Sequence, residues 1–221
     1  MTLSTTINRS QTRADKLASS LREEILRGTL SEGSALRQDQ IASRFDVSTI
    51  PVREALFQLT DEGLVEFVPN RGAFVSSISA DELRELYIIR GRLESLALEL
   101  ALPNLTDDDL SKAETYLAEM EVEKDVYKWG ELHWKFHSTL YTPSGAPRLL
   151  TMLRSLHVNL IRYMVTRTIE PGKLEYKYKI DMEHRELLDM CWARDKEIAL
   201  VYLGRHLDDS SRVLVRMGEQ V

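Results

Sequence analysis

The spacing of apolar residues predicts two different architectures, one in the first third of the chain and one in the remainder. Between residues 11 and 79, an amphipathic helix is followed by a tight two-helix segment, IASRFDVSTIPVREALFQLTDEGLV, and then by two short apolar runs around a turn. From residue 80 onward the apolar stripes have helical spacing. The pattern therefore predicts a mainly α protein with one small β-hairpin.

The second helix of the tight pair carries its apolar residues on one face. This apolar stripe consists of Val52, Ala55, Leu56 and Leu59. We expect Ser48 to cap the start of the helix and Pro51 to fit its first turn. The opposite face carries side chains that can hydrogen-bond phosphates or base edges if the helix enters a major groove, namely Thr49, Arg53 and Gln58.

The two short apolar runs lie on either side of the quartet Pro69-Asn70-Arg71-Gly72, which is typical of a turn. They therefore predict a β-hairpin with Arg71 at its tip. A cation on a narrow hairpin suits a minor groove or a row of phosphates, and Gly72 allows the backbone to approach closely. An incidental hairpin in a helical protein is the alternative for this segment alone. The whole series favours a helix-turn-helix with a wing.

The remainder of the chain is predicted to form an all-α bundle of about six helices, broken at Pro103, at Pro143 with Gly145, at Pro171-Gly172 and at Asp195. The expected helices span residues 80–102, 107–124, 125–142, 146–168, 173–193 and 195–217. The cluster Asp107-Asp108-Asp109 follows Thr106, which predicts a capped and negatively charged first turn rather than a metal site. Such a bundle could serve only to dimerise the protein.

Length and charge limit the possible functions of the 221-residue chain, whose net charge is −6. Residues 1–78 contain nine Lys or Arg and ten Asp or Glu, a net charge of −1, so DNA binding depends on where individual arginines lie. No apolar run approaches a membrane span, and the N-terminus lacks an apolar signal core, which predicts a cytoplasmic protein. The single cysteine, Cys191, excludes an internal disulfide and is expected to be a buried thiol.

These patterns predict three regions along the chain. Residues 1–10 are expected to form a disordered tail, residues 11–78 a winged-helix DNA-binding domain, and residues 80–217 a helical domain that could dimerise the protein. The segment from Ser76 to Ala80, where the wing ends and the bundle begins, is the expected hinge.

Four of the five histidines lie on apolar helical stripes, and they are His133, His137, His184 and His206. On the last helix the expected stripe consists of Ile198, Tyr202, His206 and Val213. A buried neutral imidazole needs hydrogen-bond partners, and a divalent metal held by nitrogens from three helices would satisfy all four rings. The alternative is that each histidine is a core residue satisfied by its own neighbours.

Arg90 and Glu94 lie on the apolar stripe of the first bundle helix, together with Leu83, Leu86, Tyr87, Leu93, Ala97 and Leu100. An ion pair across one helical turn would stabilise the helix without any further role. Alternatively, Arg90 holds the carboxylate of an effector in a bidentate fork. Arg162, on the fourth bundle helix, is a second candidate contact for an anion.

The first third of the chain resembles the winged-helix domain of GntR-family bacterial transcription regulators, most closely in the segments PVREAL and GLVEFVPNRGAFV. The resemblance implies that Arg37, Arg44, Arg53, Arg71 and Gly72 occupy positions that commonly contact DNA. This chain has Thr49-Ile50 where the family commonly has an Arg-Thr pair. The operator sequence of other family members therefore does not carry over to this chain.

The remainder is similar to the helical ligand-binding domain of the FadR subfamily, known as the FCD domain, in its Arg90 and Leu93-Glu94, its FHxxL motif and its later EH and H. The resemblance implies a divalent metal bound by an Asp and three His. His137, His184 and His206 match the three His, and His133 stands in place of the Asp. An all-imidazole set suits zinc or nickel. His157 matches no ligand position, which leaves it a structural or pocket-lining role.

Together these observations predict a regulator that binds a palindromic operator in double-stranded DNA as a homodimer, with a metal and a small carboxylate effector in its C-terminal domain. A metal-dependent small-molecule enzyme is the alternative from another class. Such an enzyme needs a positioned base, and only Glu131 and Glu183 lie within the histidine motifs. A regulator for which the metal itself is the signal is the third reading.

Overall fold

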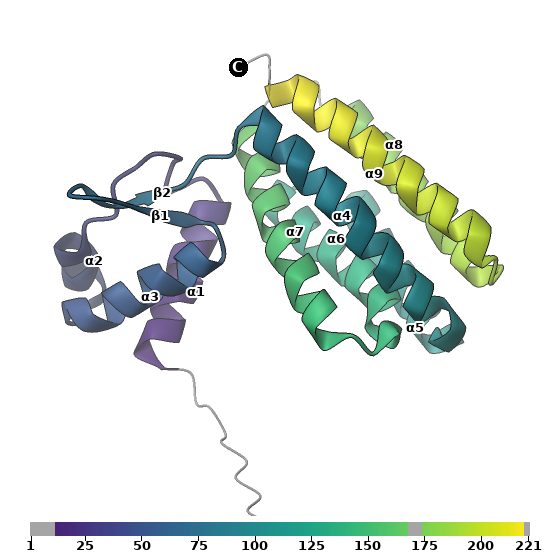
Figure 1. Cartoon of the computed structure of the whole chain (residues 1–221), viewed down its shortest axis with the longest axis horizontal. Helices are drawn as coiled ribbons and strands as arrows, with labels where there is room; N and C mark the ends of the chain where they lie inside the picture. The colour runs from purple at the N-terminus through teal and green to yellow at the C-terminus, as the bar shows by residue number, and fades with distance from the viewer. Residues whose placement is uncertain (1–11, 168–173, 219–221) are drawn as a thin grey trace, which may run out of the picture. The chain divides into compact units, whose positions relative to one another are not determined.

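The computed structural model describes residues 12–167 and 174–218 of the chain (Figure 1). The chain forms two compact units, Met1–Ser77 and Ile78–Val221. The predicted domain boundary, between residues 78 and 80, lies next to the observed boundary between these two units. The expected tail at residues 1–10 and the break at Pro171-Gly172 lie outside the described residues.

The described part of the N-terminal unit contains three helices and a two-stranded antiparallel sheet. Its elements are α1 (Arg13–Leu26), α2 (Gln38–Phe45), α3 (Thr49–Asp61), β1 (Val65–Val68) and β2 (Gly72–Val75). A reciprocal capping box between Thr12 and Asp15 begins α1, which packs against α3. The predicted stripe of α3 is fully buried, and its four members form the core between these helices. This confirms the helix-turn-helix.

The predicted hairpin is also confirmed. Strand β1 pairs with β2 in a register that places Val65 opposite Val75 and Val68 opposite Gly72. The turn between them requires positive φ angles, which are 60° at Asn70 and 97° at Gly72. Asparagine and glycine adopt this left-handed region at the lowest cost. The sequence of the turn therefore explains why the wing folds as a tight hairpin.

Over the described residues, the C-terminal unit is a bundle of six α-helices, as predicted, with two short 3-10 turns at Leu102–Asn104 and Thr142–Ser144. Its helices are α4 (Ala80–Ala101), α5 (Asp107–Val122), α6 (Val126–Tyr141), α7 (Pro147–Arg167), α8 (Leu174–Trp192) and α9 (Lys196–Gly218). Helices α4 and α9 pack side by side, as do α5 and α6 (Figure 1). No helix in the described ranges is long and apolar enough to cross a membrane.

Capping boxes explain where two of these helices begin. Ser79 with Glu82 starts α4, and Thr106 with Asp109 starts α5. The acidic first turn of α5 is therefore a capping feature, as predicted. Cys191 is buried, also as predicted, and its burial raises the pKa of its thiol to about 12.

Two of the predicted stripes are shifted from the buried faces that the structure shows. Ile198 and Leu100 are each 44% exposed, although both were predicted to face the core. The buried face of α9 instead contains Ala199, Leu203, His206, Leu207, Ser210 and Leu214, and that of α4 ends with Ala97, Leu98 and Ala101. One residue of shift rotates a helical face by about 100°, and apolar residues on both sides of each stripe allowed either choice.

Candidate metal centre and nucleic-acid interface

Four imidazoles meet inside the C-terminal unit. His133 and His137 lie one turn apart on α6, His184 lies on α8, and His206 lies on α9. One ring nitrogen from each of the four lies within 4.8 Å of the other three, and all four side chains are buried. The structure therefore brings together the four histidines that the sequence singled out.

The electrostatic environment keeps two of these imidazoles neutral. Burial first, and then the charge of neighbouring histidines, hold the pKa values of His133 and His137 well below the usual range. The positive charge of Arg90 acts in the same direction on both. Neutral imidazole is the form that donates a lone pair to a metal.

The donor atoms of the cluster fit a bound cation. Nε2 of His137 lies 3.0 Å from Nε2 of His184. Two nitrogens bound at about 2.1 Å to one cation at right angles would lie about 3.0 Å apart, which matches this separation. Nδ1 of His133 is buried and has no hydrogen-bond partner within the described part of the chain. A cation would give such nitrogens a partner, and the cluster is consistent with a metal site.

Groups behind the cluster hold two of the rings through Nδ1. Nδ1 of His137 lies 3.0 Å from the hydroxyl of Tyr141, which donates to Oε2 of Glu94 at 2.8 Å. Nδ1 of His206 lies 2.9 Å from Oε2 of Glu183. A hydrogen bond of this kind at one ring nitrogen fixes the tautomer and leaves the other nitrogen for a metal. Sequence reasoning missed Tyr141, although its spacing of four from His137 was visible.

The ion pair between Arg90 and Glu94 exists and is buried. Nε of Arg90 donates to Oε1 of Glu94 at 2.6 Å, and both side chains are at most 5% exposed. The guanidinium also lies over the ring of Tyr87, 4.8 Å from its centroid. Burial alone would lower the pKa of Arg90, but Glu94 and Tyr87 raise it above its usual value. Arg162, the other predicted anion contact, is 1% exposed.

The fifth histidine stands beside the cluster. Nε2 of His157, on α7, donates to the backbone carbonyl of Gly130 at 3.0 Å. Its ring stacks on that of His133, with centroids 5.1 Å apart and planes 7° from parallel. Burial and the nearby charge of Arg90 lower the pKa of His157 to about 3. This imidazole therefore lies against the cluster, in agreement with the structural or pocket-lining role predicted for it.

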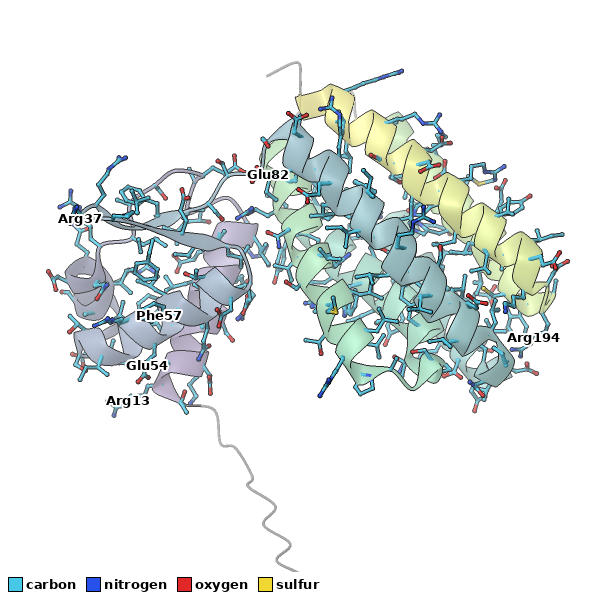
Figure 2. The ribbon with its side chains drawn as sticks, in the orientation of Figure 1. Arg13, Arg37, Glu54, Phe57, Glu82 and Arg194 are labelled. Carbon is cyan, nitrogen blue, oxygen red and sulfur yellow. The ribbon has the colours of Figure 1, made fainter. Side chains whose placement is uncertain are left out.

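In the N-terminal unit, the outward face of α3 follows the spacing i, i+3, i+4 and i+7. Its residues are Ile50, Arg53, Glu54 and Phe57. Figure 2 labels Glu54 and Phe57. The ring of Phe57 stacks against that of Phe67 in β1, with centroids 4.9 Å apart, so an aromatic pair joins α3 to the wing. Sequence reasoning named only Arg53 from this face and missed Ile50, which is 69% exposed.

Three of the predicted DNA contacts are arginines that have no counter-ion among the described residues. Arg37 lies just before α2 (Figure 2), Arg53 lies on α3, and Arg71 lies in the turn of the hairpin. All three are exposed, and none forms an ion pair with any described residue. Thr49, at the start of α3, and Gly72, at the start of β2, are exposed as well.

Two other predictions for this surface need correction. Ser48 occupies the capping position of α3, but its side chain makes no capping hydrogen bond. Gln58 was predicted to lie on the free face, yet its amide donates to Oδ1 of Asp15 at 3.0 Å and is half-buried. The DNA contact expected at Arg44 stays a prediction; its side chain is half-exposed and pairs with Glu24 at 3.0 Å. Gln58 lies where α1 packs beside α3. The prediction from helical spacing considered α3 alone and did not include this neighbouring helix.

Comparison with protein families identifies both units. Residues 13–75 match the family of bacterial regulatory proteins named gntR, and residues 85–209 match the FCD domain, which alone covers more than half of the 221 residues. The structure of E. coli McbR/YncC has the same fold, with a TM-score of 0.79 over 93% of this chain and 98% of that chain, at 24% identity. A GntR transcriptional regulator from Rhodococcus sp. RHA1 also superposes with a TM-score of 0.79, over 92% of this chain and 98% of that chain, at 25% identity.

Relatives of similar length are regulators rather than enzymes. The HTH-type transcriptional regulator YdhC of Bacillus subtilis is 30% identical over 90% of each chain. The HTH-type transcriptional repressor GlaR of Escherichia coli is 31% identical over 85% of this chain and 89% of its own length. These matches exclude the alternative of a metal-dependent enzyme. The chain belongs to the GntR family of DNA-binding bacterial transcription regulators and carries an FCD domain.

Proposed function

We propose that this regulator binds a palindromic operator as a homodimer and changes its DNA affinity when a small hydroxy- or keto-carboxylate binds beside a divalent metal in the FCD domain. The observation that carries the proposal is the convergence of four buried imidazoles from three helices, close to a buried arginine. The proposed metal ligands are His133, His137, His184 and His206. The proposed effector contacts are Arg90 and Arg162.

The DNA-binding part of the proposal rests on α3 and the wing. An outward arginine on α3 can form hydrogen bonds with a guanine or a phosphate in the major groove, and Arg71 can enter the adjoining minor groove. The proposed contacts to DNA are Arg37, Arg44, Ser48, Thr49, Arg53, Arg71 and Gly72. Two copies related by a twofold axis would place their recognition helices in half-sites about one turn of DNA apart, which is why we expect a palindrome.

We expect the metal and Arg90 to share the recognition of the effector. A bound zinc or nickel ion supplies a Lewis acid at which ligand oxygens can bind, provided that its geometry leaves positions open. Nε of Arg90 is committed to Glu94, so its terminal nitrogens are the atoms that would hold a carboxylate. The coupling to DNA affinity would act through residues Ser76–Ala80, which join the two units, with a typical size of about 1–3 kcal/mol.

The test of DNA binding uses two arginines with different surroundings. An operator is first selected from random duplexes, and affinities are then measured by fluorescence anisotropy. Arg53→Ala should weaken binding by about 1–3 kcal/mol if the guanidinium contacts a base. Arg44→Ala should cost less, because Glu24 already pairs with that guanidinium. A selected site without palindromic symmetry, or full affinity in Arg53→Ala, would refute this part of the proposal.

The test of metal and effector uses protein purified without a nickel column. Elemental analysis should find one divalent ion per subunit. A thermal-shift screen of hydroxy- and keto-carboxylates should then find compounds whose effect disappears on chelation and in Arg90→Lys, which keeps the charge but loses the planar fork. Hits that are unaffected by both changes would refute the effector pocket. If metal loading alone alters DNA affinity and no acid does, the protein senses the metal.

A further inference from the structure

We infer that Tyr141 and Glu94 are positioning residues for the metal site, because they hold His137 in the one tautomer whose Nε2 is free for a metal. This inference rests on the metal site of the proposed function. It gives the buried ion pair of Arg90 and Glu94 a role in metal binding that is separate from any contact between Arg90 and an effector.

The first step is the order of contacts. A continuous chain of three short contacts runs from Arg90 to the histidine cluster: Arg90 Nε to Glu94 at 2.6 Å, Glu94 to the Tyr141 hydroxyl at 2.8 Å, and that hydroxyl to Nδ1 of His137 at 3.0 Å. Each of these side chains is buried. Water therefore does not compete for the hydrogen bonds, and their direction is set by the protein alone.

The second step is the direction of the protons. A carboxylate has only acceptor sites, and Glu94 already accepts from Nε of Arg90 in a buried ion pair. The hydroxyl of Tyr141 must therefore donate its proton to Glu94. Its oxygen is then left with lone pairs toward the imidazole, so Nδ1 of His137 must be the donor in that contact. The neutral ring carries its lone pair on Nε2, which is the nitrogen that faces His184 at 3.0 Å.

The third step compares two histidines of the cluster. His206 reaches a carboxylate directly, through 2.9 Å between its Nδ1 and Glu183. His137 is linked to a different carboxylate, Glu94, through the intervening hydroxyl of Tyr141. The two rings are thus held in the same manner from different helices, with Nδ1 engaged in both cases. Such partners orient a metal-binding histidine and increase its basicity.

A purely structural role for the same contacts makes a different prediction. If the chain of hydrogen bonds only stabilised the fold, loss of the tyrosine hydroxyl would lower thermal stability and leave metal affinity unchanged. Tyr163 offers a matched control, because it is also a buried tyrosine in this unit and its hydroxyl donates to the backbone carbonyl of Leu214 at 3.2 Å. It is not a member of the chain of contacts from Arg90 through Glu94 and Tyr141 to His137, so Tyr163→Phe removes a similar group and leaves that chain in place.

The first measurement is the zinc affinity of full-length protein in competition with a chelator of known affinity. Tyr141→Phe should bind zinc about 10–100-fold more weakly than the unchanged protein, the usual loss for a partner of a metal ligand. Tyr163→Phe should bind zinc with unchanged affinity. Equal affinities in Tyr141→Phe and the unchanged protein would overturn the inference. Absence of zinc binding in the unchanged protein would instead refute the proposed metal site.

The second measurement needs no folded variant of Tyr141. Nitrogen-15 spectra of histidine-labelled, metal-free protein distinguish a ring protonated at Nδ1 from one protonated at Nε2, and the signals of His137 are those lost in His137→Gln. We expect His137 to be protonated at Nδ1. Protonation at Nε2, or rapid exchange between the two tautomers, would overturn the inference even if the metal site itself is correct.

Discussion

The buried imidazole of His157 makes the stability of the C-terminal unit depend on pH. Its pKa in the folded protein is about 3, against 6.5 for an ordinary histidine, because the ring is buried and lies near Arg90. Between these two values the unfolded chain binds a proton that the folded protein does not bind. Falling pH therefore favours the unfolded state, and stability is lost progressively from pH 6.5 toward pH 3.

The size of the effect follows from the pKa difference. At pH 5 the solution is 1.5 units below the unfolded value of 6.5 and still well above the folded one. Each unit corresponds to about 1.4 kcal/mol, so this residue alone should remove about 2 kcal/mol between pH 7 and pH 5. His157→Gln keeps a donor for the carbonyl of Gly130 but cannot titrate. The variant should therefore lose about 2 kcal/mol less than the unchanged protein over the same interval.

Urea unfolding followed by tryptophan fluorescence measures this difference in stability for the C-terminal unit. All three tryptophans of the chain, at positions 129, 134 and 192, belong to the C-terminal unit. Both proteins should be kept in a chelator, because the release of a metal from protonated histidines would add its own pH dependence. The reasoning is wrong if His157→Gln and the unchanged protein lose the same stability between pH 7 and pH 5.

Two further predictions concern contacts that each involve one small or exposed residue. A Cβ at Gly130 would lie 2.6 Å from Cδ1 and 2.7 Å from Cγ1 of Ile161, so Gly130→Ala should destabilise the bundle by about 1–3 kcal/mol in urea unfolding. Adding Ile161→Ala should recover part of this loss, and simple additivity of the two changes would argue against a clash. Ile50 is exposed at the first turn of α3, where an apolar side chain can contact the methyl group of thymine. Ile50→Ala should weaken binding to the operator, measured by fluorescence anisotropy. It should not weaken binding to an operator that carries deoxyuridine in place of the contacted thymine. Equal losses of affinity on both operators would contradict the contact.

Most of the fold could be predicted from the sequence, because its signals are local. The six helices of the bundle end within two residues of the predicted positions, since capping residues and prolines mark their ends. The wing was predictable because Asn70 and Gly72 tolerate the positive φ angles of its turn. The rotation of α9 was harder to predict. Ile198 and Ala199 are both apolar, and only the packing of α8 and α4 against the helix determines which is buried.

The candidate site was predictable only in part, for a related reason. Helical spacing placed four histidines on inward faces, and the structure brings them together. The groups that hold their Nδ1 atoms depend on contacts between distant segments. Tyr141 meets Glu94 across 47 positions of sequence, and His206 meets Glu183 across 23. No local pattern encodes such a pairing, so sequence reasoning treated Glu94 only as a partner of Arg90.

The distribution of charge around the four imidazoles bears on the choice of metal. The resemblance to related domains implied that His133 replaces a ligating Asp, which would remove the negative charge from the proposed ligand set. Two carboxylates, Glu94 and Glu183, lie behind the proposed ligands. Glu94 forms an ion pair with Arg90, and Glu183 forms one with Lys179. The proposed ligands are therefore all ring nitrogens, a set that suits zinc, nickel or copper better than magnesium or manganese. His133→Asp should shift this preference toward manganese in a competition experiment, because a carboxylate is a harder ligand than an imidazole. An unchanged preference in that variant would show that His133 does not bind the metal.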